Sequence, residues 1–391
     1  MELSVHIENK IKKSLNTVNF NIESSKGLPN KFYTSEEIFE YEKETVFSDN
    51  WCGIAFGSDI PDVGDIKALE FLSIPLIVVR TEKEQIQVFE NVCRHRGMIL
   101  VEESVKNKKH IRCPYHNWCY GIDGKLLSTP HVGGIGNHNH EDIKKNDLGL
   151  NKIRSHIWND TIFINISGDA SSFDDHFSRL KKRWSDFDQP MFFGGYDSEF
   201  SMCLNANWKL AIENYCESYH LPSVHPELNK TSKLSDHYHI CESENYSGQG
   251  SLLYNQISDK SDVFPDFMDL ADQWNNGTEY VALYPNVLMG VHRDQIFSVI
   301  VNPLSVTKIT ERAAFYFSEK LEQRKSMKKL LIKNKNFWKN IFEEDIYVVE
   351  GMQKGRNTRM FDGGVFSPSM EIPTHNFHKW IARALLSQIN H

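Results

Sequence analysis

Two short cysteine–histidine pairs constrain this sequence more than any other feature. Cys93 and His95 form a Cys-x-His pair, and Cys113 and His116 form a Cys-x-x-His pair, with residues 96–112 between them. Thiolates and imidazoles in two tight pairs, each at the tip of a β-hairpin, can hold a tetrahedral metal such as a structural zinc. Each pair supplies one cysteine and one histidine, however. This pattern favours a [2Fe–2S] cluster with two cysteines on one iron and two histidines on the other.

The residues around these pairs are also specific. The segments Cys93–Gly97 and Cys113–Trp118 closely resemble the two ligand loops of the Rieske family, including the proline after the second cysteine and the tryptophan two residues past the second histidine. The turn Gly121–Gly124 follows them, as in that family. The resemblance implies that both pairs together hold a Rieske [2Fe–2S] cluster. Cys119 fits neither ligand position, so we expect it to be a buried thiol.

A second constellation lies in the middle of the chain. Residues 207–220 are expected to form a helix that stops at Leu221-Pro222, because proline cannot continue a helix and disfavours helix at the preceding residue. Glu217 and His220 share one face of such a helix, and the break at Pro222 would let His225 turn towards the same metal. A His-x4-His pair alone is weak evidence, since histidines are often ordinary core or surface residues.

A 2-His-1-carboxylate iron site also needs a carboxylate. On a helical wheel of residues 338–352, Asp345 lies near the centre of an apolar arc, while Glu343, Glu344 and Glu350 fall outside it. The arc consists of Trp338, Ile341, Phe342, Val349 and Met352. A carboxylate on a buried face is costly unless it is paired, hydrogen-bonded or metal-bound. Asp345 is therefore the candidate third ligand, and an aspartate satisfied by a core hydrogen bond is the alternative.

In this order, the two constellations resemble the α-subunits of Rieske non-haem iron oxygenases over about residues 30–360. The resemblance implies an α+β fold, with an all-β Rieske domain over residues 51–166 and a helix-grip catalytic domain with a mononuclear ferrous iron over residues 167–391. The segment 1–50 is expected to pack on the catalytic domain. The family commonly forms a C3 trimer, in which each cluster faces the mononuclear iron of a neighbouring subunit.

Glu217 departs from the pattern of most members, which carry aspartate three residues before the first iron-binding histidine. The longer acid looks like the subgroup that acts on quaternary ammonium compounds such as glycine betaine, carnitine and stachydrine. The N-terminal Leu28-Pro29-x-x-Phe32-Tyr33 run also looks like that subgroup. By resemblance, Glu217 bridges a neighbour's Rieske histidine to an iron-ligating histidine and carries the electron across the interface.

The resemblance implies an oxygenase component that hydroxylates its substrate with O2. Hydroxylation of an N-methyl group gives a carbinolamine that expels formaldehyde, so the net reaction is N-demethylation or C–N cleavage of a quaternary ammonium compound. The 14 Tyr, 8 Trp and 24 Phe make a cation–π cage feasible. One alternative is a Rieske oxygenase for an aromatic substrate, by monooxygenation or dioxygenation. Others are a Rieske-type electron carrier and a zinc-stabilised binding module.

Composition limits the partners. The net charge of −8 opposes nucleic-acid binding, and seven thinly spread cysteines do not suggest a disulfide framework. The chain has no run of ~20 apolar residues and no early apolar segment of signal-peptide type, so we expect no membrane association and a cytoplasmic location. It also lacks a Gly-x-Gly-x-x-Gly fingerprint and plant-type ferredoxin spacing. Electrons are therefore expected from NAD(P)H through a separate reductase of flavin or ferredoxin type.

Periodicity predicts the main elements. Helices are expected over residues 34–49, with Thr34 or Ser35 as N-cap, and over 171–187 and 326–356. Strands are expected over residues 153–166 and 280–318, and a hairpin over 74–80 and 86–92, whereas residues 129–140 have the composition of a loop. Histidines in polar stretches without partner cysteines are expected at the surface: His138, His140, His237 and His239.

Overall fold

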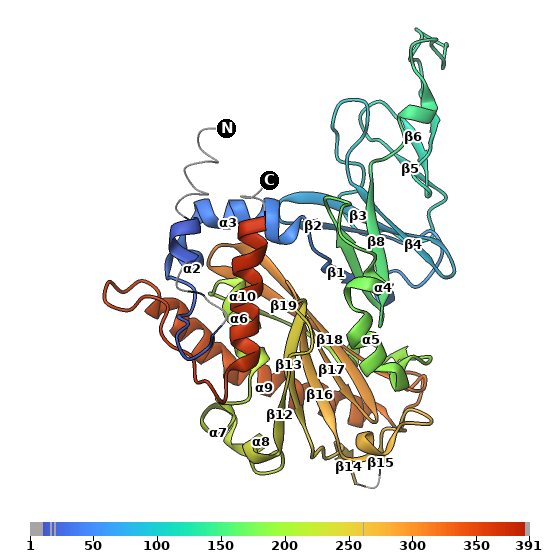
Figure 1. The fold of residues 1–391 in the computed structure, drawn as a ribbon. Coiled ribbons are helices and arrows are strands. Elements are labelled where there is room, and N and C mark those ends of the chain that lie inside the picture. The colour runs from blue at the N-terminus through green and yellow to red at the C-terminus, as the bar shows by residue number, and fades with distance from the viewer. Residues whose placement is uncertain (1–10, 16–17, 19–20, 261, 388–391) are drawn as a thin grey trace. The chain divides into compact units, whose positions relative to one another are not determined.

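The computed structural model describes residues 11–15, 18, 21–260 and 262–387, and the chain divides into two compact units (Figure 1). One unit is formed by Gly53–Asp169, and the other by Met1–Cys52 together with Ala170–His391. We call them the small and the large unit. No helix in the described part of the chain is both long and apolar enough to cross a bilayer.

The small unit is built from β-strands. Its larger sheet has the order β1-β9-β8-β4-β3-β2, formed by Cys52–Phe56, Thr161–Asn165, Lys152–Trp158, Gln85–Glu90, Ile74–Glu82 and Ile66–Phe71. A smaller sheet contains β5 (His110–Arg112), β6 (Cys119–Gly121) and β7 (Leu126–Ser128). The predicted hairpin is confirmed as β3–β4, whose register pairs Arg80 with Ile86. The strands predicted over residues 153–166 are confirmed as β8 and β9, and residues 129–140 form a loop.

The large unit is organised around an antiparallel sheet with the order β10-β19-β18-β17-β16-β13-β12, and β11 also pairs with β19. Its strands are Phe192–Phe193 (β10), Glu199–Leu204 (β11), His237–Ile240 (β12), Tyr246–Ser251 (β13), Thr278–Leu283 (β16), Val287–His292 (β17), Gln295–Ser305 (β18) and Lys308–Phe317 (β19). The β-rich character predicted for residues 280–318 is confirmed. β17 is buried throughout, as expected for a strand inside a sheet that is covered on both faces.

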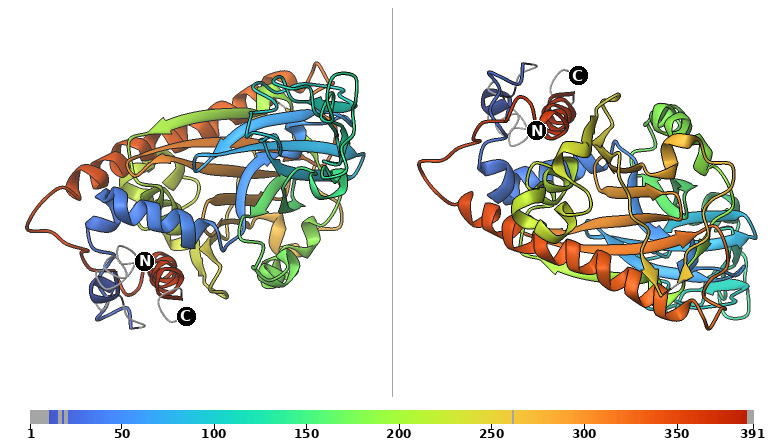
Figure 2. Two further views of the ribbon diagram at one scale, coloured as in Figure 1. Left: turned by 90° about the horizontal axis from the view of Figure 1, so that it is seen from above. Right: turned by 90° about the horizontal axis from the view of Figure 1, so that it is seen from below.

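Helices cover this sheet. The long α9 (Lys328–Gly355) runs along it and contacts β11, while α6 (Trp208–Cys216) packs against α9 and against β13, β16 and β18 (Figure 2). α10 (Ile372–Ser387) contacts α6 and β13. The sheet with its long helix is the helix-grip arrangement predicted for this half of the chain, and the α+β fold class is confirmed. The helix predicted over residues 326–356 is α9.

The first predicted helix is divided. The structure has α2 (Lys31–Thr34), α3 (Glu36–Glu42) and a π-helical turn η1 (Lys43–Phe47) instead of one helix over residues 34–49. Ser35 is the N-cap of α3, because its side chain accepts a hydrogen bond from the Ile38 N–H. Thr34 belongs to α2, where its hydroxyl donates to the Asn30 carbonyl, so the alternative N-cap at Thr34 is wrong.

The second predicted helix is also interrupted. Residues 171–187 form α4 (Phe173–His176), α5 (Ser178–Arg183) and a 3₁₀ turn η4 (Ser185–Phe187), with Ser172 as the N-cap of α4. Each piece buries an aromatic or aliphatic side chain, namely Phe173, Leu180 and Phe187. The apolar spacing was therefore identified correctly, but its continuity as one helix was not.

A fully buried ion pair ties the N-terminal helices to α6. The Lys209 ammonium lies 2.7 Å from Glu42 Oε1, and both side chains are completely shielded from solvent. Trp208 Nε1 donates to the other oxygen of Glu42 at 3.0 Å. Nearby, the Tyr33 hydroxyl donates to Glu213 Oε1 at 2.6 Å. These contacts hold the start of α6, and with it the segment that leads to Glu217, His220 and His225.

Candidate metal centres and the adjoining cavity

The two Cys-His loops of the small unit have the same backbone design. Cys93 N–H donates to the Met98 carbonyl and Cys113 N–H to the Trp118 carbonyl, both at 2.8 Å. Four residues after each cysteine, Gly97 and Asn117 donate back to the cysteine carbonyl and adopt positive φ values of 73° and 56°. Glycine and asparagine tolerate this left-handed backbone better than other residues. Both loops are therefore tight turns with the cysteine at their base.

These loops bring the four predicted cluster residues together. Cys93 and Cys113 are buried free thiols, and the rings of His95 and His116 lie 4.7 Å apart between centroids. Burial raises the pKa of the Cys113 thiol. The Tyr120 hydroxyl lies 3.3 Å from Cys93 Sγ and can donate to it.

The donor set fits a Rieske cluster. His116 Nδ1 is shielded from solvent and has no hydrogen-bond partner in the described part of the chain. A buried ring nitrogen of this kind needs a hydrogen-bond partner or a metal ion, and neutral imidazole is a common metal ligand. Two thiols and two imidazoles, one of each from either loop, match a [2Fe–2S] cluster with mixed ligation.

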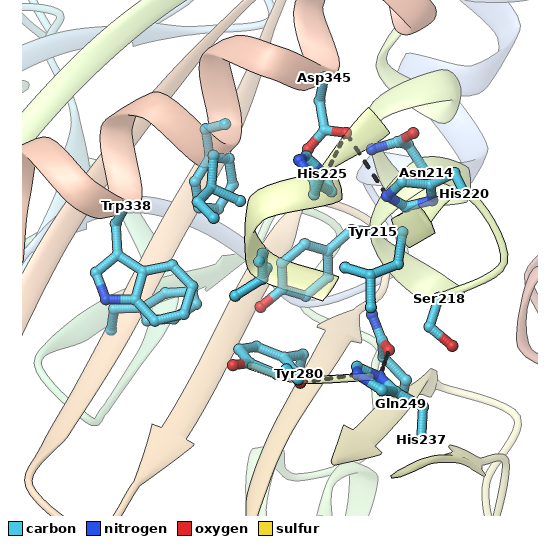
Figure 3. A pocket seen from close by; sticks show the side chains of 16 residues that line it. Asn214, Tyr215, Ser218, His220, His225, His237, Gln249, Tyr280, Trp338 and Asp345 are labelled. Atoms are coloured by element: carbon cyan, nitrogen blue, oxygen red, sulfur yellow. Dashed lines mark hydrogen bonds and ion pairs between the residues drawn. The ribbon is translucent and has the colours of Figure 1, made fainter. Parts of the chain in front are cut away.

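In the large unit, His220, His225 and Asp345 form a second candidate metal site, with ligand atoms all within 4.8 Å of one another (Figure 3). Asp345 Oδ1 lies 3.1 Å from His225 Nε2 and 3.6 Å from His220 Nε2. The His225 side chain is almost fully buried, while those of His220 and Asp345 are mostly buried. Two imidazoles and one carboxylate are the donor set of a non-haem ferrous site with open positions.

The outer nitrogen of each histidine is held by a further carboxylate. His220 Nδ1 lies 2.7 Å from Glu217 Oε1, and His225 Nδ1 lies 2.7 Å from Glu344 Oε2. Such contacts fix the tautomer in which Nε2 is free for a metal. Burial opposes protonation of His225, but Asp345 and Glu344 outweigh it and raise its pKa. Both histidine rings therefore present Nε2 to Asp345, and this geometry fits a divalent cation.

The backbone reaches this geometry differently from the predicted route. α6 ends at Cys216 and Glu217 is extended, with φ −128° and ψ 162°, so the predicted continuation of the helix to His220 is wrong. Pro222 does not end a helix but lies in the first turn of α7 (Leu221–Val224), and Pro226 opens α8 (Pro226–Asn229). Proline suits the first helical turn because no hydrogen bond is lost there. His220 and His225 flank α7, and their ring centroids lie 5.2 Å apart.

A cavity adjoins the second site and holds about 600 Å³ of space, its open mouth included (Figure 3). Much of its wall is aromatic, contributed by Tyr215, Tyr280, Phe297, Trp338 and Phe342. Polar side chains also line it, among them Ser218, Ser232, His237 and Gln249. Asp345 and both histidines of the triad open onto the same cavity. A ligand held in it would therefore lie directly beside the candidate metal site.

Two family models match this chain. The family model of the Rieske [2Fe-2S] domain matches residues 50–139, and that of the ring hydroxylating alpha subunit (catalytic domain) matches residues 194–387. The chain is a Rieske non-haem iron oxygenase α-subunit. The predicted family and enzyme class are confirmed.

Among the relatives of this α-subunit is the carnitine monooxygenase oxygenase subunit of Escherichia coli (strain K12), 26% identical over 343 residues that cover 86% of either chain. The glycine betaine monooxygenase oxygenase subunit of Pseudomonas aeruginosa (strain UCBPP-PA14) is 33% identical over 206 residues, which are 52% of this chain and 46% of that protein. A solved quaternary ammonium Rieske monooxygenase matches with a TM-score of 0.74 at 23% identity, covering 95% of this chain and 97% of its own.

The fold itself is shared more widely. Naphthalene 1,2-dioxygenase from Rhodococcus sp. matches the α-subunit with a TM-score of 0.77 at 19% identity, with 99% of either chain covered. Likeness at this identity concerns the fold alone, so the choice of substrate depends on the residues of the cavity.

Sequence reasoning missed part of that cavity. His237 was expected at the surface, but it is half-buried, lines the cavity and contacts Gln249. Its strand β12 and the partner strand β13 were not predicted, because β12 is polar and β13 contains Gly248 and Gly250.

Met352 was assigned to the apolar arc of α9 but is exposed, whereas Trp338, Phe342 and Val349 are buried. Cys119 is buried, as expected.

Proposed function

We propose that this α-subunit is the oxygenase component of a Rieske-type monooxygenase that hydroxylates a quaternary ammonium compound, with N-demethylation or C–N cleavage as the result. The observation that carries the proposal is the aromatic wall of the cavity beside His220, His225 and Asp345. Aromatic faces attract a quaternary ammonium group through cation–π interactions. The names of the relatives, carnitine and glycine betaine monooxygenase oxygenase subunits, support the same substrate class.

Each group of residues is proposed to have its own role. Cys93, His95, Cys113 and His116 would hold the [2Fe–2S] cluster, and His220, His225 and Asp345 would hold a ferrous ion. When bound, these groups supply electron transfer and O2 activation. The aromatic wall holds the ammonium group next to the triad. Glu217 and Glu344 keep the two iron-site histidines in one tautomer.

The product chemistry follows from the position that is hydroxylated. An N-methyl group converted to N–CH2OH breaks its C–N bond, releases formaldehyde and a proton, and leaves a tertiary amine. Hydroxylation of the carbon that links the trimethylammonium group to the rest of the substrate releases trimethylamine instead. In both cases one atom of O2 enters the substrate, and two electrons and two protons reduce the other atom to water.

The electrons are proposed to come from NAD(P)H through a separate reductase, of flavin or ferredoxin type. We also propose a homotrimer in which Glu217 links the His220 ring to a cluster histidine of a neighbouring subunit. In the described structure, Glu217 Oε1 contacts His220 Nδ1 at 2.7 Å, and its side chain retains 12% exposure. Glu217 Oε2 also accepts hydrogen bonds from the backbone N–H groups of Tyr219 and His220. The remaining exposure of the side chain supports a role as a bridge to one further donor.

A turnover screen tests the proposal. Iron-replete protein with a surrogate reductase is incubated with betaines, carnitine, choline and aromatic acids, and oxygen uptake is followed together with formaldehyde and trimethylamine. We expect amine or formaldehyde release that matches oxygen uptake with at least one ammonium compound. Hydroxylated aromatic products with no turnover of any ammonium compound would favour the alternative function as an aromatic oxygenase.

A further inference from the structure

The described wall of the cavity carries few charged side chains. None of the described residues that line it is a lysine or arginine, and its one carboxylate is Asp345 in the metal triad. In Figure 3, Trp338 lies at the left, Tyr215 lies in the middle, and Tyr280 lies beside the polar group of His237 and Gln249. A bound ammonium compound therefore has aromatic side chains for its cation and a polar patch at one end of the cavity for its other group.

The polar patch is a connected network. His237 Nδ1 lies 2.6 Å from Gln249 Oε1, and His237 Nε2 lies 3.0 Å from the Ser232 hydroxyl. Gln249 Nε2 donates to the Glu217 carbonyl at 3.3 Å. The neutral histidine that donates from Nδ1 accepts from Ser232 at Nε2, and the Gln249 amide keeps one further N–H. Ser232 Oγ also lies 3.0 Å from Ser251 Oγ, so the patch offers one amide donor and the remaining lone pair of the Ser232 oxygen, but no positive charge.

We infer that this patch, formed by Ser232, His237 and Gln249, binds an uncharged hydrogen-bonding end of the substrate, so that the enzyme prefers ammonium alcohols to zwitterionic ammonium carboxylates. The inference rests on the proposed function and narrows its substrate class. A hydroxyl group both donates and accepts, so it can pair with the Gln249 N–H and with the Ser232 oxygen. A carboxylate only accepts hydrogen bonds. It would lose its hydration on binding and find no cationic side chain in the patch to compensate.

The state of His237 agrees with this assignment. Burial lowers the pKa of His237, so at neutral pH its ring is uncharged and offers no cation to a carboxylate. The choice between the two classes of substrate therefore depends on hydrogen bonds and desolvation at one end of the cavity. The aromatic side chains should interact equally with the trimethylammonium group that both classes share.

Three probes of nearly equal size separate these effects. Choline and glycine betaine share the trimethylammonium group and differ in the hydroxyl or carboxylate end, and 3,3-dimethylbutan-1-ol is the uncharged carbon analogue of choline. Binding to the anaerobic holoprotein is measured by calorimetry, so that the readout is independent of turnover. We expect choline to bind at least about tenfold more tightly than glycine betaine, and also more tightly than the uncharged alcohol.

The outcomes separate the inference from the proposed function. Glycine betaine that binds as tightly as choline, with both tighter than the uncharged alcohol, would overturn the inference and leave the proposed function intact. An uncharged alcohol that binds as tightly as choline, or no binding of either ammonium compound, would overturn the proposed function itself.

A variant of His237 provides a second test. His237→Lys places a cation in the patch and is expected to shift the choline-to-betaine ratio of Kd values towards betaine by about tenfold. Ser235→Lys is the control, because it adds the same charge two residues before His237 at an exposed position that does not line the cavity. A shift of equal size in His237→Lys and Ser235→Lys would overturn the inference.

Discussion

Asp345 Oδ1 lies 3.1 Å from His225 Nε2 and 3.6 Å from His220 Nε2, so the proposed ferrous site should depend strongly on this side chain. We expect Asp345→Ala to lose the mononuclear iron and turnover but to keep the visible absorption of the Rieske cluster, since the two sites use different side chains. Metal analysis with absorption spectroscopy measures both.

Glu344 serves as the comparison for that variant. It contacts His225 Nδ1 and not the inner nitrogen, so Glu344→Ala should weaken iron binding by about 10–100-fold without removing a ligand. Full activity in Asp345→Ala together with complete iron loss in Glu344→Ala would show that the roles of the two acids are reversed.

Cys113 tests the cluster in the same way. Its thiol is buried at the base of one loop, and no second cysteine of that loop can replace it, because Cys119 begins β6. Cys113→Ala is expected to be colourless and free of acid-labile sulfide, whereas the wild type is red-brown with iron and sulfide. Zinc without sulfide in anaerobically purified wild-type protein would contradict the cluster assignment.

Glu217 is expected to act in electron transfer and not in metal binding. Glu217→Gln removes no metal ligand, so both metals should remain and the cluster should still be reduced chemically. Its oxygen can still accept a hydrogen bond from His220, but the negative charge that holds the tautomer and favours the bridge is lost. Oxidation of the pre-reduced cluster in a single turnover with substrate and O2 should therefore slow by orders of magnitude.

The shorter acid is the control for the bridge. Glu217→Asp keeps the charge but loses one methylene of reach, so we expect intermediate oxidation rates. Wild-type rates in Glu217→Gln would exclude the bridging role and weaken the assignment to the quaternary-ammonium subgroup.

Single residues also show where sequence reasoning reaches its limit. The structure brings together the three predicted triad residues, which the sequence singles out because a non-haem iron site uses two histidines and a carboxylate. His237 was not found, because its role arises from a strand pairing that brings it to Gln249. Nothing within residues 237–251 repeats a ligand spacing, so only the tertiary structure brings these side chains to the cavity.

At the scale of elements, the short helices α7 and α8 position the two histidines of the candidate iron site. Pro222 and Pro226 each lie in a first helical turn, so the chain makes two short helices and places a histidine before each. The sequence signals a break near Pro222, but the same residue is compatible with ending a helix or starting one. The position of the break, at Glu217, depends on the packing of α6 and could not be read from the prolines.

The pair between Glu42 and Lys209 is a fully buried link between the N-terminal helices and α6. Burial raises the pKa of Glu42 and lowers that of Lys209, and each partner opposes the shift of the other. We expect Lys209→Met to lower the free energy of unfolding by about 3–5 kcal/mol, because it leaves the Glu42 carboxyl buried without its partner. The midpoint of chemical unfolding measures the loss.

Two further variants separate charge pairing from packing. Glu42→Leu combined with Lys209→Met should recover much of the stability, since two apolar side chains can replace a buried ion pair. Lys230→Met removes a partner from an exposed pair with Glu227 and should change stability by no more than about 0.5 kcal/mol. A double variant less stable than Lys209→Met would show that the contribution is not one of charge pairing.

For the whole molecule, the family and both halves of the fold could be predicted because two metal motifs in fixed order are rare. The strands near the Rieske loops and the long α9 have clear apolar periodicity, and they were predicted closely. The edges of the large sheet were not, since β12 and β13 are polar or glycine-rich, and α10 begins at Ile372-Pro373 in a segment for which no helix was predicted. Such edges form because neighbouring strands and helices stabilise them.

The proposed trimer makes a quantitative prediction for mixed assemblies. Cys113→Ala subunits lack the cluster and Asp345→Ala subunits lack the iron, so neither variant should turn over alone. If each cluster serves the iron of a neighbouring subunit, trimers reassembled from an equal mixture contain interfaces where an intact cluster faces an intact iron. With random assembly in a closed ring, about a quarter of all interfaces are of this kind, and activity should return to about a quarter of the wild-type value. Transfer within a single subunit would instead leave the mixture inactive, because no subunit in it carries both sites.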